Sequence, residues 1–122
     1  MFRRTTAVVV TVALVTLAAA PALAATGPWS DHYGNAGKAT VAADRRSITV
    51  CDLDNHDTLR FKVDFATDKL VGPTIYTVVA PQGGCSSDRT YVSWIKVFKL
   101  CVGHRIISEI GWDSCNLPVY TK

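Results

Sequence analysis

The sequence predicts an all-β fold, a small antiparallel β-sandwich or barrel of about six to eight strands stapled by two disulfides. The clearest observation is the stretch 58–65, where apolar and polar residues alternate with a period of two. Several other short runs rich in β-branched and aromatic residues are separated by Gly, Pro and Asp clusters. No long stretch combines helical periodicity with helix caps, which favours strands throughout.

The first residues have the layout of a secretory signal peptide. Arg3 and Arg4 precede an uncharged run that ends at Pro21, and a small-residue cleavage site follows at residues 22–24. A transmembrane helix needs about 20 apolar residues, and this run is shorter. Because Thr5 follows the arginine pair, ordinary export is favoured over a twin-arginine signal.

The expected organisation is a signal peptide over residues 1–24, an irregular leader over 25–37 and a disulfide-stapled β domain over 38–122. In the leader, Trp29 and Tyr33 are possible anchors onto the domain. We therefore expect a secreted, extracellular protein.

Composition and charge exclude several classes of protein. Hydrophobic residues make up 48% of the 122 residues, too many for a disordered tail, and charged residues make up only 19%, too few for a coiled coil. The formal charge of +3 includes Arg3 and Arg4, so the mature chain carries one net positive charge. We expect no nucleic-acid partner, and no membrane contact after signal cleavage.

Hydrophobic patterns and turn residues predict where the strands of the mature chain begin and end. Short strands are predicted over 38–43 and 47–52, before a polar loop. The alternating strand 58–65 and a strand over 74–80 follow, and a closing strand is predicted over 117–121. Residues 105–110 fit either a strand or one helical turn.

The longest strand is predicted over residues 89–102. One face would carry Val92, Trp94, Phe98, Leu100 and Val102, with Lys96 interrupting the run. The other face would carry Tyr91, Ile95, Val97 and Cys101. Apolar residues on both faces predict a central position, with Trp94 in the core.

The four cysteines predict two disulfides, because the count is even and export leads to an oxidising compartment. Zinc sites need close pairs such as C-x-x-C, which this sequence lacks. Of the three possible pairings we favour Cys51–Cys85 with Cys101–Cys115, since Cys101 ends an apolar strand and Cys115 follows a compact excursion. The other two pairings stay open.

The order of these segments resembles a known group of proteins. It comprises Ser-Ile-Thr-Val-Cys-Asp at 47–52, the alternating strand, the Gly-Gly-Cys loop ending at Cys85, Phe-Lys-Leu-Cys at 98–101 and Asp-Ser-Cys at 113–115. It resembles small secreted two-disulfide β proteins found in many actinobacteria, over about residues 37–115. The resemblance supports the favoured pairing and implies no catalytic residues.

The acidic loop at residues 52–57 is a candidate calcium site, but its pattern does not fit. Asp57 stands where a calcium-binding loop needs glycine, and Val63 stands where it needs a bidentate glutamate. We interpret the loop as a hairpin turn in which Asp side chains bind nearby backbone groups. No metal and no cofactor are expected.

Catalytic chemistry has little support in the sequence. His32, His56 and His104 are scattered, Glu109 is the only glutamate, and both the G-x-S-x-G and H-E-x-x-H motifs are absent. Ser86 or Ser87 would need a base and an orienting group that no motif supplies. The chain is therefore not expected to be an enzyme.

The segment 102–114, closed by Cys101 and Cys115, is the candidate binding region. We expect Trp112 to act as its anchor and Arg105 as its polar contact. Alternatively, Ile106, Ile107 and Ile110 simply pack the segment onto the domain; these three isoleucines then belong to the core.

The sequence thus predicts a monomeric, non-enzymatic secreted domain that binds an unknown protein or cell-envelope ligand, or an enzyme that it inhibits. The alternatives are a small secreted hydrolase without a recognisable motif and a structural protein of the cell surface. Surface proteins usually show repeats, and none is visible here.

Overall fold

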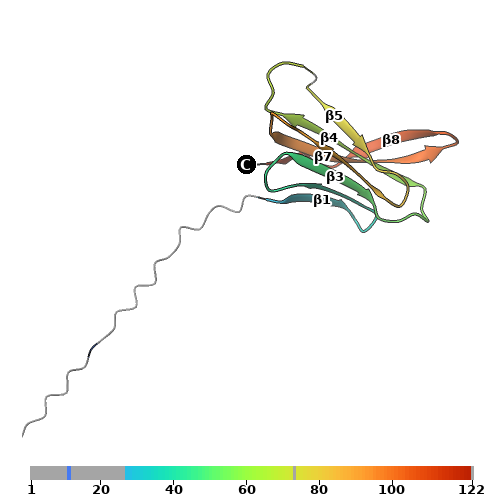
Figure 1. Ribbon diagram of the computed structural model, residues 1–122. Helices are drawn as coiled ribbons and strands as arrows, with labels where there is room; N and C mark the ends of the chain where they lie inside the picture. Colours follow the sequence, from blue (N-terminus) through green and yellow to red (C-terminus); the bar gives the residue numbers. More distant parts are fainter. Residues whose placement is uncertain (1–10, 12–26, 73, 122) are drawn as a thin grey trace, which may run out of the picture.

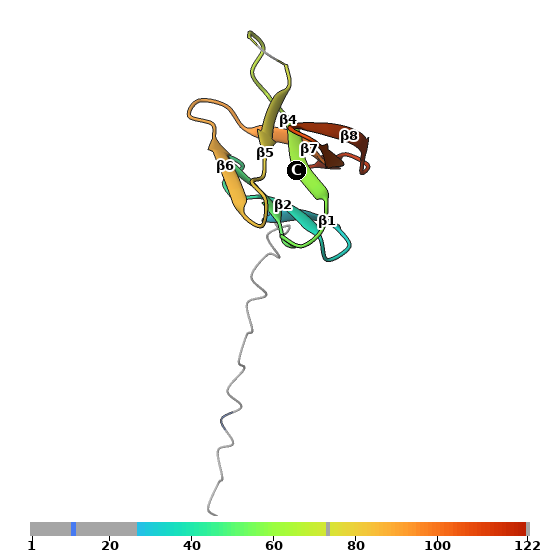
Figure 2. The same cartoon turned by 90° about the vertical axis from the view of Figure 1, so that its right-hand side faces the viewer.

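The computed structural model describes residues 11, 27–72 and 74–121, and these form two antiparallel β-sheets packed face to face (Figures 1 and 2). One sheet contains β1 (Trp29–Tyr33), β2 (Gly37–Val41), β3 (Ser47–Asp52) and β6 (Cys85–Arg89). The other contains β4 (Leu59–Thr67), β5 (Tyr76–Val79), β7 (Ile95–Ile106), β8 (Glu109–Cys115) and β9 (Val119–Tyr120). The all-β sandwich is therefore confirmed.

The strand order is β1-β2-β3-β6 in the four-stranded sheet and β5-β4-β7-β8 in the five-stranded sheet, where β9 also pairs with β7. The chain changes sheet between β3 and β4, between β5 and β6, and between β6 and β7. The predicted hairpin turn at residues 52–57 is therefore wrong, since this loop connects the two sheets. Its prediction failed because a turn-rich sequence does not reveal which sheet the next strand joins.

The core lies between the sheets and is built from alternating residues. Phe61, Val63 and Phe65 of β4 are buried, as the period of two predicts. Ile48 and Val50 of β3 face them from the other sheet. Trp29 packs against this core, and the Tyr33 ring lies 5.7 Å from the Phe61 ring, so both anchor the N-terminal strand.

Two strands were missed by the sequence-based prediction. The leader predicted to be irregular over 25–37 contains β1, which pairs along its whole length with β2. Its glycine-rich surroundings concealed a strand whose only apolar residues are Trp29 and Tyr33. Strand β6 is polar and largely exposed, so it carries no hydrophobic pattern. The described residues hold nine strands in total.

The predicted strand 89–102 is wrong in its first half. Residues 90–94 form a loop, and Trp94 is 48% exposed rather than in the core. Strand β7 begins at Ile95 and pairs with β4 through a bulge: Thr67 pairs with Ile95 and Ala66 with Val97, so Lys96 is the extra residue. The bulge turns Ile95 inward with Phe98, Leu100 and Val102, although simple alternation predicts opposite faces.

Both favoured disulfides are present. Cys51 is directly opposite Cys85 in the β3–β6 pair, and Cys101 is directly opposite Cys115 in the β7–β8 pair. Each bridge therefore joins neighbouring strands of one sheet.

One ion pair is buried at the end of the sandwich where β3 stops. Asp52 Oδ2 lies 3.8 Å from Arg60 NH1, and both side chains are almost fully buried. Arg60 also donates to the Leu59 carbonyl, 2.7 Å away. None of the described segments forms a helix with the length and apolar character that crossing a bilayer requires.

The predicted signal peptide at residues 1–24 lies outside the described residues, except for Thr11.

Candidate functional site

The candidate binding segment 102–114 forms a β-hairpin that extends beyond the sandwich at the end opposite the start of β7 (Figure 1). We call it the stapled hairpin, because the Cys101–Cys115 disulfide closes its base. The stretch 105–110, predicted as a strand or one helical turn, is the tip, where β7 and β8 meet through Ile107 and Ser108. The outer edge of β8 pairs with no other described strand.

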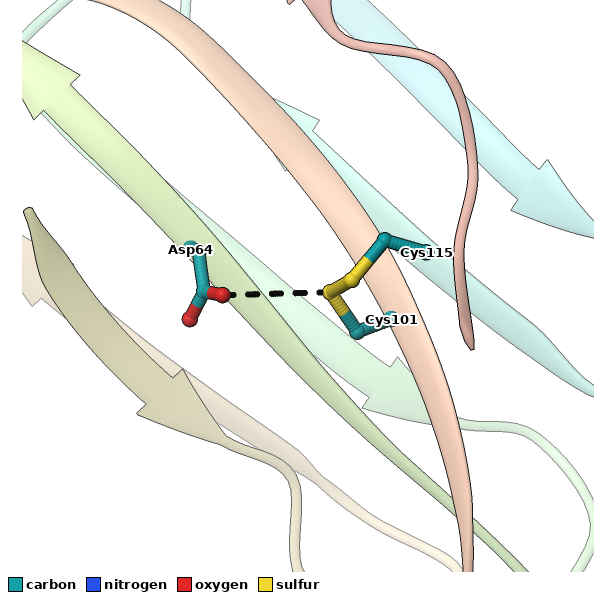
Figure 3. A group of neighbouring side chains, drawn as sticks. All are labelled: Asp64, Cys101 and Cys115. Atoms are coloured by element: carbon teal, nitrogen blue, oxygen red, sulfur yellow. Dashed lines mark hydrogen bonds between the residues drawn. A yellow bond between two sulfur atoms is a disulfide. The ribbon is translucent and has the colours of Figure 1, made fainter. Parts of the chain in front are cut away.

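The base of the hairpin resembles a metal centre only superficially. Asp64, Cys101 and Cys115 bring their ligand atoms within 4.8 Å of one another, and Asp64 Oδ2 lies 3.8 Å from the Cys101 sulfur (Figure 3). Both sulfurs are bonded to each other, so neither is a thiolate that can bind a metal. Asp64 instead accepts a hydrogen bond from Thr77 and pairs with Lys62.

A bulge in β8 and a glycine in β7 allow the Trp112 ring to lie against β7. Asp113 is the extra residue between the pairs Val102–Ser114 and Gly103–Trp112. A Cβ on Gly103 would lie 2.4 Å from the Gly111 carbonyl oxygen and 2.8 Å from the Trp112 ring, so only glycine fits there. The Lys62 ammonium lies 5.1 Å from the Trp112 ring centre. Trp112 therefore keeps 36% of its surface exposed while packing on the sheet.

The tip of the hairpin exposes two isoleucines among polar residues, and its backbone is unfavourable at one of them. Ile107 is 90% exposed with φ of +57°, a region that β-branched residues rarely occupy. Arg105 Nε donates to the Ile107 carbonyl over 2.9 Å and thereby supports the turn. Ile106 is also exposed, and the residues 106–111 surround a shallow hollow of about 280 Å³.

The structure places the two predicted binding residues on the same face of the hairpin. Arg105 pairs with Ile110, and Trp112 pairs with Gly103, so alternate positions bring Arg105 and Trp112 to one side. The expected alternative, that the isoleucines pack onto the domain, does not describe Ile106 and Ile107, which are exposed. The sequence did not predict the exposure of Ile107, since nothing in its pattern marks an exposed isoleucine.

The other face of the hairpin carries a histidine–aspartate pair. His104 Nδ1 lies 2.8 Å from Asp113 Oδ2, and both side chains are well exposed. His32 lies on β1, and His56 lies in the acidic loop, so the three histidines are not brought together. Ser87 bonds with Thr49, 2.7 Å away, across the β3–β6 pair.

The acidic loop uses its carboxylates to hold its own backbone. Asp52, Asp54 and Asp57 each accept a hydrogen bond from the backbone N–H two residues later, at 3.2, 2.9 and 3.1 Å. These are the local bonds that the turn-rich sequence predicts. Within the described ranges, these carboxylates are not gathered around a common point as a cation site would require.

A second exposed apolar region lies at the opposite end of β7, and the sequence did not predict it. We call it the loop end; it comprises residues 42–46, 68–72 and 90–94. The Trp94 N–H donates to Asp68 Oδ1 over 2.6 Å, and the Asp68 N–H donates to the Trp94 carbonyl over 3.0 Å. Arg46 NH1 donates to the Tyr91 carbonyl, so all three loops are joined.

The loop end exposes five large apolar side chains: Leu70, Val71, Tyr91, Val92 and Trp94. The sequence does contain a sign of apolar loops, because two apolar pairs, at 70–71 and 91–92, stand between turn residues. Their meeting in space depends on the sandwich topology, which the sequence alone does not give.

The chain matches no protein-family model, no curated protein and no solved structure.

Proposed function

We propose that this protein is a secreted, non-enzymatic binding domain whose stapled hairpin inserts into an apolar hollow of a partner protein. The observation that carries the proposal is Ile107: it exposes 90% of its surface at a φ of +57°. Exposing an isoleucine gains nothing in the free protein, and the left-handed backbone costs free energy. Both features are accounted for if a partner covers the tip.

The hairpin is suited to this role because it is ordered before binding. The disulfide fixes its base, and the hydrogen bond from Arg105 to the Ile107 carbonyl fixes its tip. A pre-ordered segment loses less conformational entropy on association than a flexible one. The outer edge of β8, which pairs with none of the described strands, offers backbone N–H and C=O groups to an extended strand of the partner.

Charge favours a protein over a polyanionic surface at this site. The tip carries Arg105 but also Glu109, and Asp113 lies farther along β8. Arg105 is the one Arg or Lys of the segment 102–114 and is outnumbered by these two carboxylates, so the hairpin does not favour a polyanion. An enzyme or receptor with a concave apolar site is therefore the partner class that fits best. If the partner is a secreted enzyme, binding of the hairpin in that site would inhibit it.

A secreted hydrolase is the competing function, and the His104–Asp113 pair is the observation that favours it. A histidine–carboxylate pair needs a nucleophile within hydrogen-bond reach before it can catalyse hydrolysis. Among the described side chains, His104 bonds only with Asp113. A screen of the secreted protein against polysaccharide and peptide substrates tests this alternative, and turnover abolished by His104→Ala would establish it.

The binding proposal is tested by a pull-down from culture medium and cell-envelope fractions with the oxidised protein as bait. Ile107→Asp and Trp112→Ala should each lose the captured partner, whereas Leu117→Asp should retain it, because Leu117 is exposed but lies outside the hairpin. Circular dichroism checks that each bait is folded. Capture that is equal for all four baits would exclude the hairpin as the interaction surface.

A further inference from the structure

The loop end exposes Leu70 and Val71 on a loop tip, beside a hollow of about 200 Å³ whose lining includes Lys69, Arg89, Tyr91 and Val92. Leu70 is 99% exposed, and Val71 is 77% exposed, at the tip of the β4–β5 loop, which projects from the sandwich in both views (Figures 1 and 2). Val92 is 88% exposed on the neighbouring β6–β7 loop. A convex apolar tip needs a pocket in a protein partner, but it enters a lipid interface without one.

Basic side chains accompany these apolar tips. Within or beside the loop end are five basic residues and three acidic ones: Arg45, Arg46, Lys69, Arg89 and Lys96, with Asp44, Asp68 and Asp88. The rest of the described domain, residues 27–121, carries five basic and seven acidic residues. The near-neutral net charge of the mature chain therefore conceals a positive loop end and a negative remainder.

The acidic residues of the loop end are engaged with the backbone. Asp68 accepts from the Trp94 N–H, Asp88 from the Arg89 N–H, and Asp44 from the Arg46 N–H. No ion pair within the described part of the chain involves a basic residue of this end. The positive charges of Lys69, Arg89 and Lys96 are thus exposed and available to an anionic surface.

Two aromatic residues lie beside the apolar tips. Tyr91 is largely exposed, and Trp94 is half-exposed with the Arg45 guanidinium 5.4 Å from its ring centre. Tyrosine and tryptophan favour the headgroup region of a bilayer, where one part of the ring is apolar and the other reaches water.

We propose that the loop end is a peripheral membrane-binding surface that inserts Leu70, Val71 and Val92 into an anionic lipid bilayer. Lys69, Arg89 and Lys96 then lie at the level of the lipid phosphates, as in other surfaces that combine apolar insertion with electrostatic attraction. This revises the expectation from net charge that membranes are not a partner. The proposal is independent of the stapled hairpin, which lies at the other end of β7.

The test is co-sedimentation of the oxidised protein with large unilamellar vesicles. Vesicles of phosphatidylcholine with phosphatidylglycerol should bind the protein, vesicles of phosphatidylcholine alone should bind it weakly, and high salt should reduce binding. The double variant Leu70→Asp/Val71→Asp should bind the anionic vesicles at least about tenfold more weakly. Replacing Lys69 or Arg89 by alanine should each reduce binding about fivefold.

Leu117→Asp is the matched control, since it places the same acidic side chain at an exposed leucine outside the loop end, and it should bind like the unaltered protein. Retained vesicle binding by Leu70→Asp/Val71→Asp would overturn the proposal, as would equal binding to the two lipid compositions. Capture of a soluble protein through Leu70 and Val71, without vesicle binding, would assign the loops to a protein partner and also overturn it.

Discussion

The stapled hairpin and the loop end lie at opposite ends of β7, and they support their exposed apolar residues differently. The hairpin is two paired strands closed by the Cys101–Cys115 disulfide. The loop end has no disulfide, and its three segments are held by hydrogen bonds such as those between Asp68 and Trp94. Their charges also differ, since basic residues predominate at the loop end only.

This difference explains why one region was predictable and the other was not. The hairpin is one continuous segment between cysteines 14 residues apart, and its closure could be favoured because Cys101 ends an apolar strand. The loop end combines segments between residues 42 and 94. A surface assembled from distant segments becomes visible only after the strand order is known.

The largest loss of stability is expected from breaking the buried Asp52–Arg60 ion pair, at the end of the sandwich from which the hairpin extends. Asp52→Ala removes the partner of the buried Arg60 and should cost about 3–5 kcal/mol in unfolding free energy. The double variant Asp52→Leu/Arg60→Met should recover most of that loss, because no charge is left buried without a partner. Urea unfolding measures both, and a loss below about 1 kcal/mol for Asp52→Ala would contradict a buried ion pair of this kind.

Removing the Cys101–Cys115 disulfide should have the next largest effect on stability, and it should affect the two regions differently. Cys101→Ser/Cys115→Ser should lower the unfolding free energy by about 3 kcal/mol, because the disulfide closes a 14-residue loop. Hydrogen exchange should accelerate in residues 103–112 and stay unchanged in residues 68–72 and 90–94. Equal acceleration in both regions would show that the loop end depends on the bridge at the other end of β7.

Replacing one tryptophan in each region should give stability losses of intermediate size, which compares how firmly the two regions hold them. Trp112→Ala should cost about 2 kcal/mol, because Trp112 packs on Gly103 and lies near Lys62, whereas a full core position would cost about 3–5 kcal/mol. Trp94→Ala should cost about 1 kcal/mol, since Trp94 is more exposed and its N–H bond to Asp68 belongs to the backbone. Thermal melts should therefore show a larger drop in melting temperature for Trp112→Ala than for Trp94→Ala.

The smallest effect has the opposite sign. Ile107→Asn should stabilise the protein by about 1 kcal/mol, because asparagine tolerates the left-handed backbone better than a β-branched residue does. Ile106→Asn is the control, since Ile106 is exposed in ordinary strand geometry and should show no gain. A destabilised Ile107→Asn would mean that the isoleucine makes useful contacts within the free protein.

The parts of the fold that follow local pattern were predictable. The alternation in β4 indicated its buried face, and the predicted strand 47–52 coincides with β3. The pairing favoured because Cys101 ends an apolar strand and Cys115 follows a compact excursion is the one observed. In each of these cases the information lies within a short segment of the chain.

The errors arose where a tertiary contact overrode the local pattern. The bulge at Lys96 shifted the inward face of β7 by one residue, and it depends on pairing with Thr67 of another strand. Trp94 was expected in the core but lies in a loop held by Asp68. For the candidate site, the sequence indicated Trp112 and Arg105 but not Ile107, whose exposure and φ are properties of the folded hairpin.

The placement of the two disulfides bears on oxidative folding. Each bridge joins directly opposed residues of neighbouring strands, Cys51 with Cys85 and Cys101 with Cys115. Oxidation therefore locks the register of two strand pairs, and a slip of one residue would turn the side chains of a strand to the wrong face. No bridge between described residues crosses from one sheet to the other, so a fully oxidised chain is covalently free to separate its sheets. Complete native oxidation thus reports correct strand alignment, and the docking of the sheets must be followed by a separate probe of the core.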